Sequence, residues 1–110
     1  MSENQVSYTD FSKLDLRTAV IVDAKLHPNA DRLYILDVKV GEEQKQIVAG
    51  IRLHYAPSEL VGKTVIVVNN LEPATIRGIQ SNGMVLAVNT GDRIVLLTSD
   101  REVPPGAQVR

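Results

Sequence analysis

Three polar side chains in one long loop, those of Asn70, Arg77 and Ser81, are the residues of this chain best suited to binding a ligand. A guanidinium forms paired hydrogen bonds with a phosphate, and a small hydroxyl or an amide can bond a phosphate or a sugar hydroxyl. The loop covers residues 69–84 and separates two very apolar segments. Because binding residues concentrate on loops that a rigid scaffold positions, we expect this loop to carry function.

Each of these residues also has a purely structural interpretation. Arg77 could be an ordinary solvated residue, although its place in the loop favours binding. Ser81 could equally stabilise a turn, and for Asn70 a hydrogen bond to nearby backbone is favoured over a ligand contact. The dipeptide Asn82-Gly83 is a strong hairpin signal, so we assign both of its residues to geometry rather than to binding.

Further cations could join Arg77 if the fold places them on the same face. These candidates for contacts with a nucleic-acid backbone are Arg32, Lys45, Arg52 and Lys63. The net charge of −1 argues against binding nucleic acid by bulk attraction. Residues 44–93 nevertheless carry five basic and three acidic side chains, which allows a modest positive face.

The composition gives no support to catalysis or to a bound cofactor. There is no Cys, which excludes disulfides and thiolate metal sites and fits a reducing, cytoplasmic setting. His27 and His54 are each isolated from a second ligand candidate, so no metal site is predicted. No nucleophile, paired carboxylate or oxyanion loop accompanies them, and we therefore expect no enzymatic activity.

The length of 110 residues allows one domain with a single core. The first five residues lack the basic start and apolar run of a secretory signal. Apolar runs are too short to cross a bilayer, so we predict no membrane partner.

Alternating apolar residues predict strands over residues 17–26, 33–40 and 44–49, joined as a meander. Pro57 and Gly62 bracket a short helix, and the apolar segments 63–68 and 84–88 predict two buried strands. Residues 93–98 suggest a further strand. Near the start, residues 9–14 could form one helical turn capped by Thr9 or Asp10.

Five strands with a helix between the third and the fourth is the order of the OB-fold, an all-β barrel that commonly binds oligonucleotides. The aromatic residues Tyr8, Phe11, Tyr34 and Tyr55 are too few and too separated to form a base-stacking platform. Recognition of RNA by such a barrel would then favour shape and backbone over sequence.

Several separated motifs resemble one family in the right order: DFSKLDLR at 10–17, HPNADRL at 27–33, IVAGIR at 47–52, LVGK at 60–63, and the loop at 69–84. Over about residues 8–88 the chain resembles the tRNA-binding domain of the methionyl-tRNA synthetase C-terminal type, and it looks like a free-standing form or beta subunit. The resemblance implies an OB-fold, a tRNA ligand and a homodimer formed through residues 6–14 and 93–109.

The resemblance also bears on two positions of the loop. It places Met84 in the family's Ser-any-Gly-Met binding patch, whereas the structural alternative is a core Met. Many members carry two basic residues after the Pro that matches Pro73, but this chain has Ala74 and Thr75 there. Since phosphate contacts drive salt-dependent affinity, this departure predicts weak binding or dependence on a dimer.

The sequence therefore predicts a single tRNA-binding domain, residues 1–110, with residues 93–110 as a dimerisation extension. We expect a non-catalytic dimer that assists methionyl-tRNA synthetase or acts alone. An alternative is a dimeric, secretion-related chaperone of the same fold that binds unfolded polypeptide. A third is an interaction subunit whose main partner is the synthetase catalytic chain.

Overall fold

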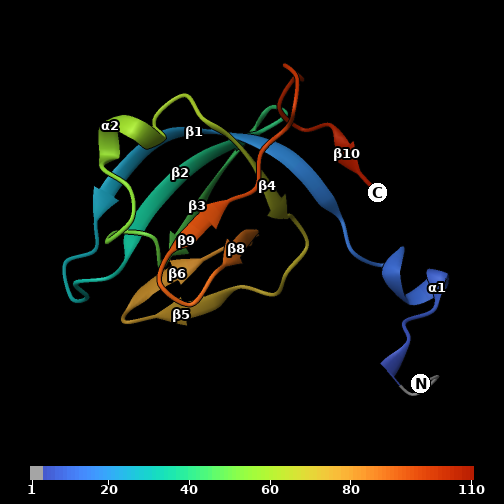
Figure 1. Ribbon diagram of the computed structural model, residues 1–110, viewed down its shortest axis with the longest axis horizontal. Coiled ribbons are helices and arrows are strands. Elements are labelled where there is room, and N and C mark those ends of the chain that lie inside the picture. Colours follow the sequence, from blue (N-terminus) through green and yellow to red (C-terminus); the bar gives the residue numbers. More distant parts are fainter. Residues whose placement is uncertain (1–3) are drawn as a thin grey trace.

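The computed structural model describes residues 4–110, which form a strongly curved antiparallel sheet with two four-residue helices (Figure 1). Residues 1–3, part of the N-terminus in which we see no secretory signal, lie outside the described residues. Among the described residues, no helix is long and apolar enough to cross a membrane.

Five strands follow one another across the sheet in the order β3-β2-β1-β4-β7. They are β1 (Leu16–Leu26), β2 (Tyr34–Val40), β3 (Glu43–Ala49), β4 (Thr64–Val68) and β7 (Met84–Val85). The strand β10 (Gln108–Val109) pairs with the start of β1, and the helix α2 (Pro57–Leu60) lies between β3 and β4. The predicted all-β barrel of the OB type is confirmed.

The core follows from the alternation that the sequence showed. In β2 the side chains of Tyr34, Leu36 and Val38 point into the barrel and are buried, while Lys39 is exposed. The helix α2 contributes Leu60, which has no exposed surface. In β4, residues 65–68 are all buried, which confirms a strand covered on both faces.

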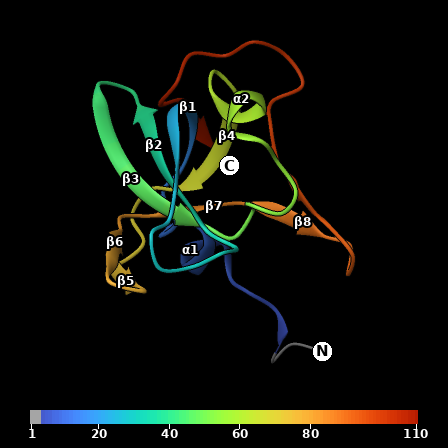
Figure 2. The same cartoon turned by 90° about the vertical axis from the view of Figure 1, so that its left-hand side faces the viewer.

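Two small hairpins extend the barrel (Figure 2). One consists of β5 (Ala74–Ile76) and β6 (Ile79–Ser81), and the other of β8 (Ala87–Asn89) and β9 (Ile94–Leu96). The first covers the open edge of β3, where the amide of Val48 donates to Ser81 Oγ at 3.0 Å. The amide of Asn82 donates to the carbonyl of Gln46 at 2.8 Å, which adds a second hydrogen bond between this loop and β3.

The predictions for residues 84–88 and for the cap of the first helix were wrong. Residues 84–88 do not form one buried strand: β7 ends at Val85, and residues 87–89 leave β4 to pair with β9. Met84 and Val88 are accordingly exposed. The first helix, α1 (Tyr8–Phe11), is capped by neither Thr9 nor Asp10, because Ser7 Oγ accepts the amide of Asp10.

The C-terminal segment belongs to the barrel rather than lying apart from it. The Thr18 hydroxyl donates to the carbonyl of Pro104 at 2.9 Å and accepts the amide of Ala107 at 2.9 Å. Gly106 has a positive φ of 90°, and a Cβ there would lie 2.6 Å from the Gly41 amide nitrogen. By contrast, α1 projects away from the barrel, at the lower right of Figure 1.

Candidate functional site

Arg77 lies at the tip of the β5–β6 hairpin. The strand pairing ends at Ile76↔Ile79, which leaves Arg77 and Gly78 as a two-residue turn with φ of 54° and 88°. Both angles are left-handed, as in a type I′ turn, where Asn and Gly are the usual residues. Arg77 is the one non-glycine residue with positive φ among residues 4–110. Strained backbone of this kind is often retained at functional sites.

Asn82-Gly83 does not form the hairpin turn that we expected from its sequence. The hairpin turn is at Arg77-Gly78. Gly83 instead makes the close approach that ends the loop, with φ of 144°. A Cβ at this residue would lie 3.0 Å from the carbonyl oxygen of Val68 and 3.3 Å from Ile47 Cδ1. Only glycine fits this approach without displacement of its neighbours.

A buried histidine fastens the hairpin to the loop between β1 and β2. His27 is 3% exposed, and its Nε2 lies 3.0 Å from the carbonyl oxygen of Ile76. The amide of Asn29 donates to Nδ1 of the same ring at 3.0 Å. Since a carbonyl oxygen only accepts, Nε2 carries the proton and donates. The ring thus holds the two loops at a fixed separation.

Arg52 positions the same β1–β2 loop from the side of β3. One of its guanidinium nitrogens donates to the carbonyl of Ala30 at 3.1 Å, and its amide donates to the carbonyl of Arg32. Arg32 and Arg77, from different loops, consequently line one hollow of about 330 Å³, together with Ala30, Asp31 and Leu33. The structure thus brings three of the predicted cations, Arg32, Arg52 and Arg77, to one end of the barrel, the arginine end.

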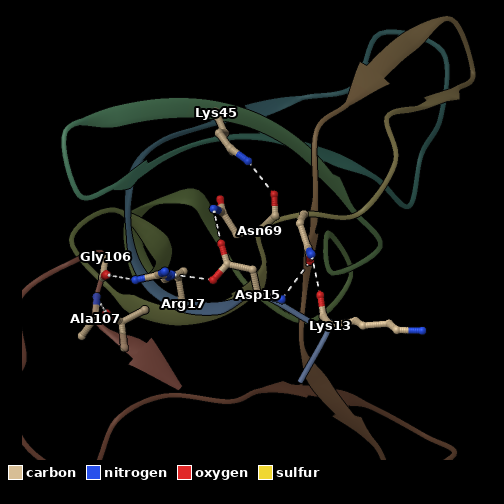
Figure 3. Close-up of polar contacts among 9 residues, drawn as sticks. Lys13, Asp15, Arg17, Lys45, Asn69, Gly106 and Ala107 are labelled. Atoms are coloured by element: carbon tan, nitrogen blue, oxygen red, sulfur yellow. Dashed lines mark hydrogen bonds and ion pairs between the residues drawn. The ribbon is translucent and has the colours of Figure 1, made fainter. Parts of the chain in front are cut away.

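A polar network fixes the other end of the loop (Figure 3). The Asn70 side chain accepts the amide of Asp15 at 2.9 Å and donates to the carbonyl of Lys13 at 2.7 Å. This geometry supports pinning, the favoured role of Asn70, and direct contact with RNA stays a prediction. Lys45 Nζ donates to the carbonyl of Asn69 at 2.6 Å, so this ammonium supports the loop from β3.

Asp15 is the charged centre of that network. Hydrogen bonds from Asn69 Nδ2 at 3.0 Å and from Arg17 Nε at 2.7 Å stabilise its carboxylate and hold its pKa below the ordinary value of 3.8. Arg17 also donates to the carbonyl of Gly106 at 3.2 Å. The base of the loop, the start of β1 and the C-terminal segment are joined through one ionised group.

Ser81 lies inside the structure at 3% exposure. Its hydroxyl accepts the amide of Val48 at 3.0 Å and donates to the carbonyl of Gly83 at 3.0 Å. The hydroxyl proton is thereby used within the chain. The role that this geometry supports is to hold the hairpin on β3, and direct contact with RNA stays a prediction.

The remaining candidates are spread more widely. Met84 is 44% exposed, so the alternative of a core Met is wrong and its side chain is accessible to a ligand. Lys63 follows α2, which lies at the opposite end of the barrel from β5 and β6 in both views (Figures 1 and 2). Lys45 lines a separate hollow of about 630 Å³ that also contains Asp37 and Glu43, a mixture unfavourable to a polyanion.

Within residues 4–110, no group of three or more His, Cys, Asp or Glu side chains is arranged to hold a metal ion. What the loops bring together is hydrogen-bond donors and positive charge.

The family profile described as "Putative tRNA binding domain" matches residues 16–108. The chain belongs to this family. The predicted resemblance to the tRNA-binding domain of the methionyl-tRNA synthetase C-terminal type is confirmed. The match continues past residue 88, where the motifs in the sequence end, and includes the C-terminal segment that Thr18 holds.

Three proteins similar to this chain are a methionine–tRNA ligase, a MetRS-related protein and a chaperone. Methionine–tRNA ligase of Thermococcus kodakarensis is 49% identical over 105 residues, which cover 96% of this chain and 14% of the ligase. The crystal structure of a MetRS-related protein from Pyrococcus horikoshii has a TM-score of 0.90 and 32% identity, covering 97% of this chain and 99% of that one. The chaperone CsaA from Bacillus anthracis has a TM-score of 0.88 and 30% identity, with 96% and 99% covered.

Sequence reasoning missed the part that His27 plays in this family member. The motif HPNADRL was interpreted as a turn because of its Pro and Asn, and its histidine was considered only as a metal ligand. A buried histidine between two loops has no periodicity that would reveal it. Its bond to Ile76 follows from the tertiary arrangement alone.

Proposed function

We propose that this protein binds tRNA by its folded shape and catalyses no reaction. The observation that carries the proposal is the shared hollow of Arg32 and Arg77 in a chain of the tRNA-binding family. In an OB-fold, the loop between the first two strands and the loop before the fifth strand are the usual sites for nucleic acid. These are the two loops that present Arg32 and Arg77.

In the proposed mechanism, Arg77 and Arg32 donate to phosphate oxygens while Arg52 holds the backbone that carries Arg32. Hydrogen bonds of the Asn70 and Ser81 side chains hold the loop in place. Met84, at the end of the loop, offers exposed apolar surface. A contribution from Lys45 or Lys63 would require an RNA that extends beyond the arginine end, because Lys45 lines a separate hollow and Lys63 follows α2 at the opposite end of the barrel. Ala74 and Thr75, both exposed in β5, add no charge, which favours modest affinity.

Direct binding to tRNA, compared with a duplex RNA of equal length over a salt series, tests the proposal. We expect tighter binding to tRNA, and an affinity about tenfold lower for Arg77→Gln at moderate salt. Arg101→Gln is the matched control, since Arg101 is exposed and does not line the hollow that Arg32 and Arg77 share. Equal affinity for both RNAs would reject recognition by shape.

A homodimer is the assembly we propose. The side chains of Tyr8, Phe11 and Leu14 line a hollow of about 180 Å³ together with Val109, and all three are exposed. Apolar surface on a projecting segment is typical of an interface. A second copy seated there would present two arginine ends to one tRNA. Sedimentation equilibrium of the protein and of Phe11→Asp tests this, with a monomeric wild type as the contradicting result.

The partner that the relatives suggest is methionyl-tRNA synthetase, which this chain would assist or complete as its beta subunit in the cytoplasm. The chain covers 14% of the Thermococcus ligase, so it would supply RNA binding and not the aminoacylation chemistry. Copurification with the synthetase catalytic chain, with and without tRNA, tests the association.

Binding of unfolded polypeptide is the second candidate. It is favoured by the similarity to the chaperone CsaA, which extends over 96% of this chain. The exposed apolar residues around α1 would then form a groove for peptide between two copies. A competition measurement between tRNA and a permanently unfolded polypeptide distinguishes the two functions.

A further inference from the structure

A second hollow lies on the other side of Arg32. It measures about 400 Å³ and is enclosed by the segment after β3 and the turn between β8 and β9. Its lining residues are Arg32, Gly50, Leu53, His54, Asn89, Gly91, Asp92, Arg93 and Ile94. Because Arg32 also lines the hollow of Arg77, the two hollows adjoin through one side chain.

The turn that carries Arg93 is well ordered by its own hydrogen bonds. The Thr90 hydroxyl donates to Asp92 Oδ1 at 2.7 Å, and the amide of Thr90 donates to the carbonyl of Arg93 at 3.0 Å. The amide of Gly91 donates to Asn89 Oδ1 at 2.9 Å. These hydrogen bonds order the backbone from which the Arg93 side chain extends.

The guanidinium groups at this end are free to take a polyanion. None of the ion pairs found within residues 4–110 involves Arg32, Arg77 or Arg93. Two carboxylates lie nearby, those of Asp31 and Asp92, one in each hollow. Three arginines against two aspartates leave a positive balance along the line from Arg77 to Arg93.

The second hollow also offers apolar surface. Leu53 and His54 both line it, and Leu53 is 64% exposed. Pockets of about 300–1,000 Å³ suit small organic groups, and unpaired bases commonly lie against apolar or aromatic side chains. A guanidinium can bind the phosphate of a nucleotide, and exposed apolar surface next to it can contact the base.

We propose that bound RNA continues from Arg77 across Arg32 into this second hollow, where Arg93 binds a phosphate and Leu53 and His54 receive an unpaired base. The proposal rests on the proposed tRNA-binding function and extends it to a third loop. It assigns the second hollow to a single-stranded part of the ligand, since a base within a duplex cannot be turned toward the protein without unpairing.

Salt-dependent binding of purified tRNA to single variants tests the two halves separately. Arg93→Gln should weaken binding about fivefold and lower the slope of log K against log salt by about 0.7, the value for one phosphate on single-stranded RNA. Arg93→Lys should keep the slope. Leu53→Ser should weaken binding about threefold and leave the slope unchanged, because no charge is removed.

Matched controls lie outside both hollows. Arg101→Gln removes an exposed arginine, and Val61→Ser removes an apolar side chain that is 52% exposed. Wild-type affinity and slope for both Arg93→Gln and Leu53→Ser, with a weakened Arg77→Gln, would overturn the second hollow alone. A wild type that fails to bind tRNA would instead overturn the proposed function.

Discussion

His27 and Ile76 join the two loops that carry the arginine end, through a ring nitrogen 3.0 Å from a carbonyl oxygen. Ile76 directly precedes Arg77, so this contact sets the position from which the guanidinium extends. The amide of Asn29 holds the other ring nitrogen at 3.0 Å, which fixes the orientation of the imidazole. The histidine is thus a positioning residue for both loops.

We expect His27→Ala to destabilise the protein by about 1–2 kcal/mol, because a buried carbonyl loses its donor and a cavity remains. Amide hydrogen exchange should accelerate in residues 74–81, and tRNA affinity should fall although no cation is removed. His54→Ala, at an exposed histidine, is the control for stability and hydrogen exchange. Unchanged exchange in the hairpin would contradict the positioning role.

Arg77 occupies a backbone conformation that favours another residue. Its φ of 54° is left-handed, and Asn tolerates this region better than Arg does. Arg77→Asn should therefore stabilise the protein by about 1 kcal/mol while weakening tRNA binding, as expected where strain is retained for function. Thermal unfolding and a binding titration on the same sample measure both effects. A variant that is more stable and binds equally well would remove Arg77 from the interface.

The barrel was predictable because its information is local. Alternation in residues 34–40 and the doubly apolar residues 65–68 predicted strands that the structure contains. The β5–β6 hairpin was not predicted, because Arg77-Gly78 is an uncommon turn and Asn82-Gly83 is the stronger signal. From the sequence, the cations of the arginine end could be named only one by one. Arg32 and Arg77 are 45 positions apart, and only the folded structure shows that their loops meet.

The ionised Asp15 should make the free energy of unfolding decrease at acidic pH. Hydrogen bonds from Asn69 and Arg17 hold its pKa below 3.8, so its stabilising contribution is complete above that value and is lost as the pH falls through the lower folded-state value. Asp15→Asn should be less stable than wild type near neutral pH, and the difference should narrow toward about pH 2. Thermal unfolding over this range measures it, with Asp10→Asn as the exposed control.

Gly106 tests whether the C-terminal segment is part of the fold. A Cβ at this residue would meet the Gly41 backbone at 2.6 Å, whereas at Gly91, which also has positive φ, a Cβ would meet nothing within 4 Å. Comparing the two alanine variants separates packing from backbone strain. Gly106→Ala should cost about 2 kcal/mol more than Gly91→Ala in unfolding by denaturant. Equal costs would show that the segment packs loosely against the turn between β2 and β3 at Gly41.

Ser81 distinguishes support of the loop from contact with RNA. Its buried hydroxyl bonds Val48 and Gly83, so Ser81→Ala leaves a buried amide without its acceptor and should cost about 1–3 kcal/mol of stability. Well below the melting temperature, the variant should bind tRNA with the salt slope of wild type, because the guanidinium of Arg77 is untouched. Ser81→Cys retains a weak acceptor and should recover part of the stability. Loss of affinity in a variant whose hairpin amides exchange as slowly as those of wild type would instead place the hydroxyl on the RNA.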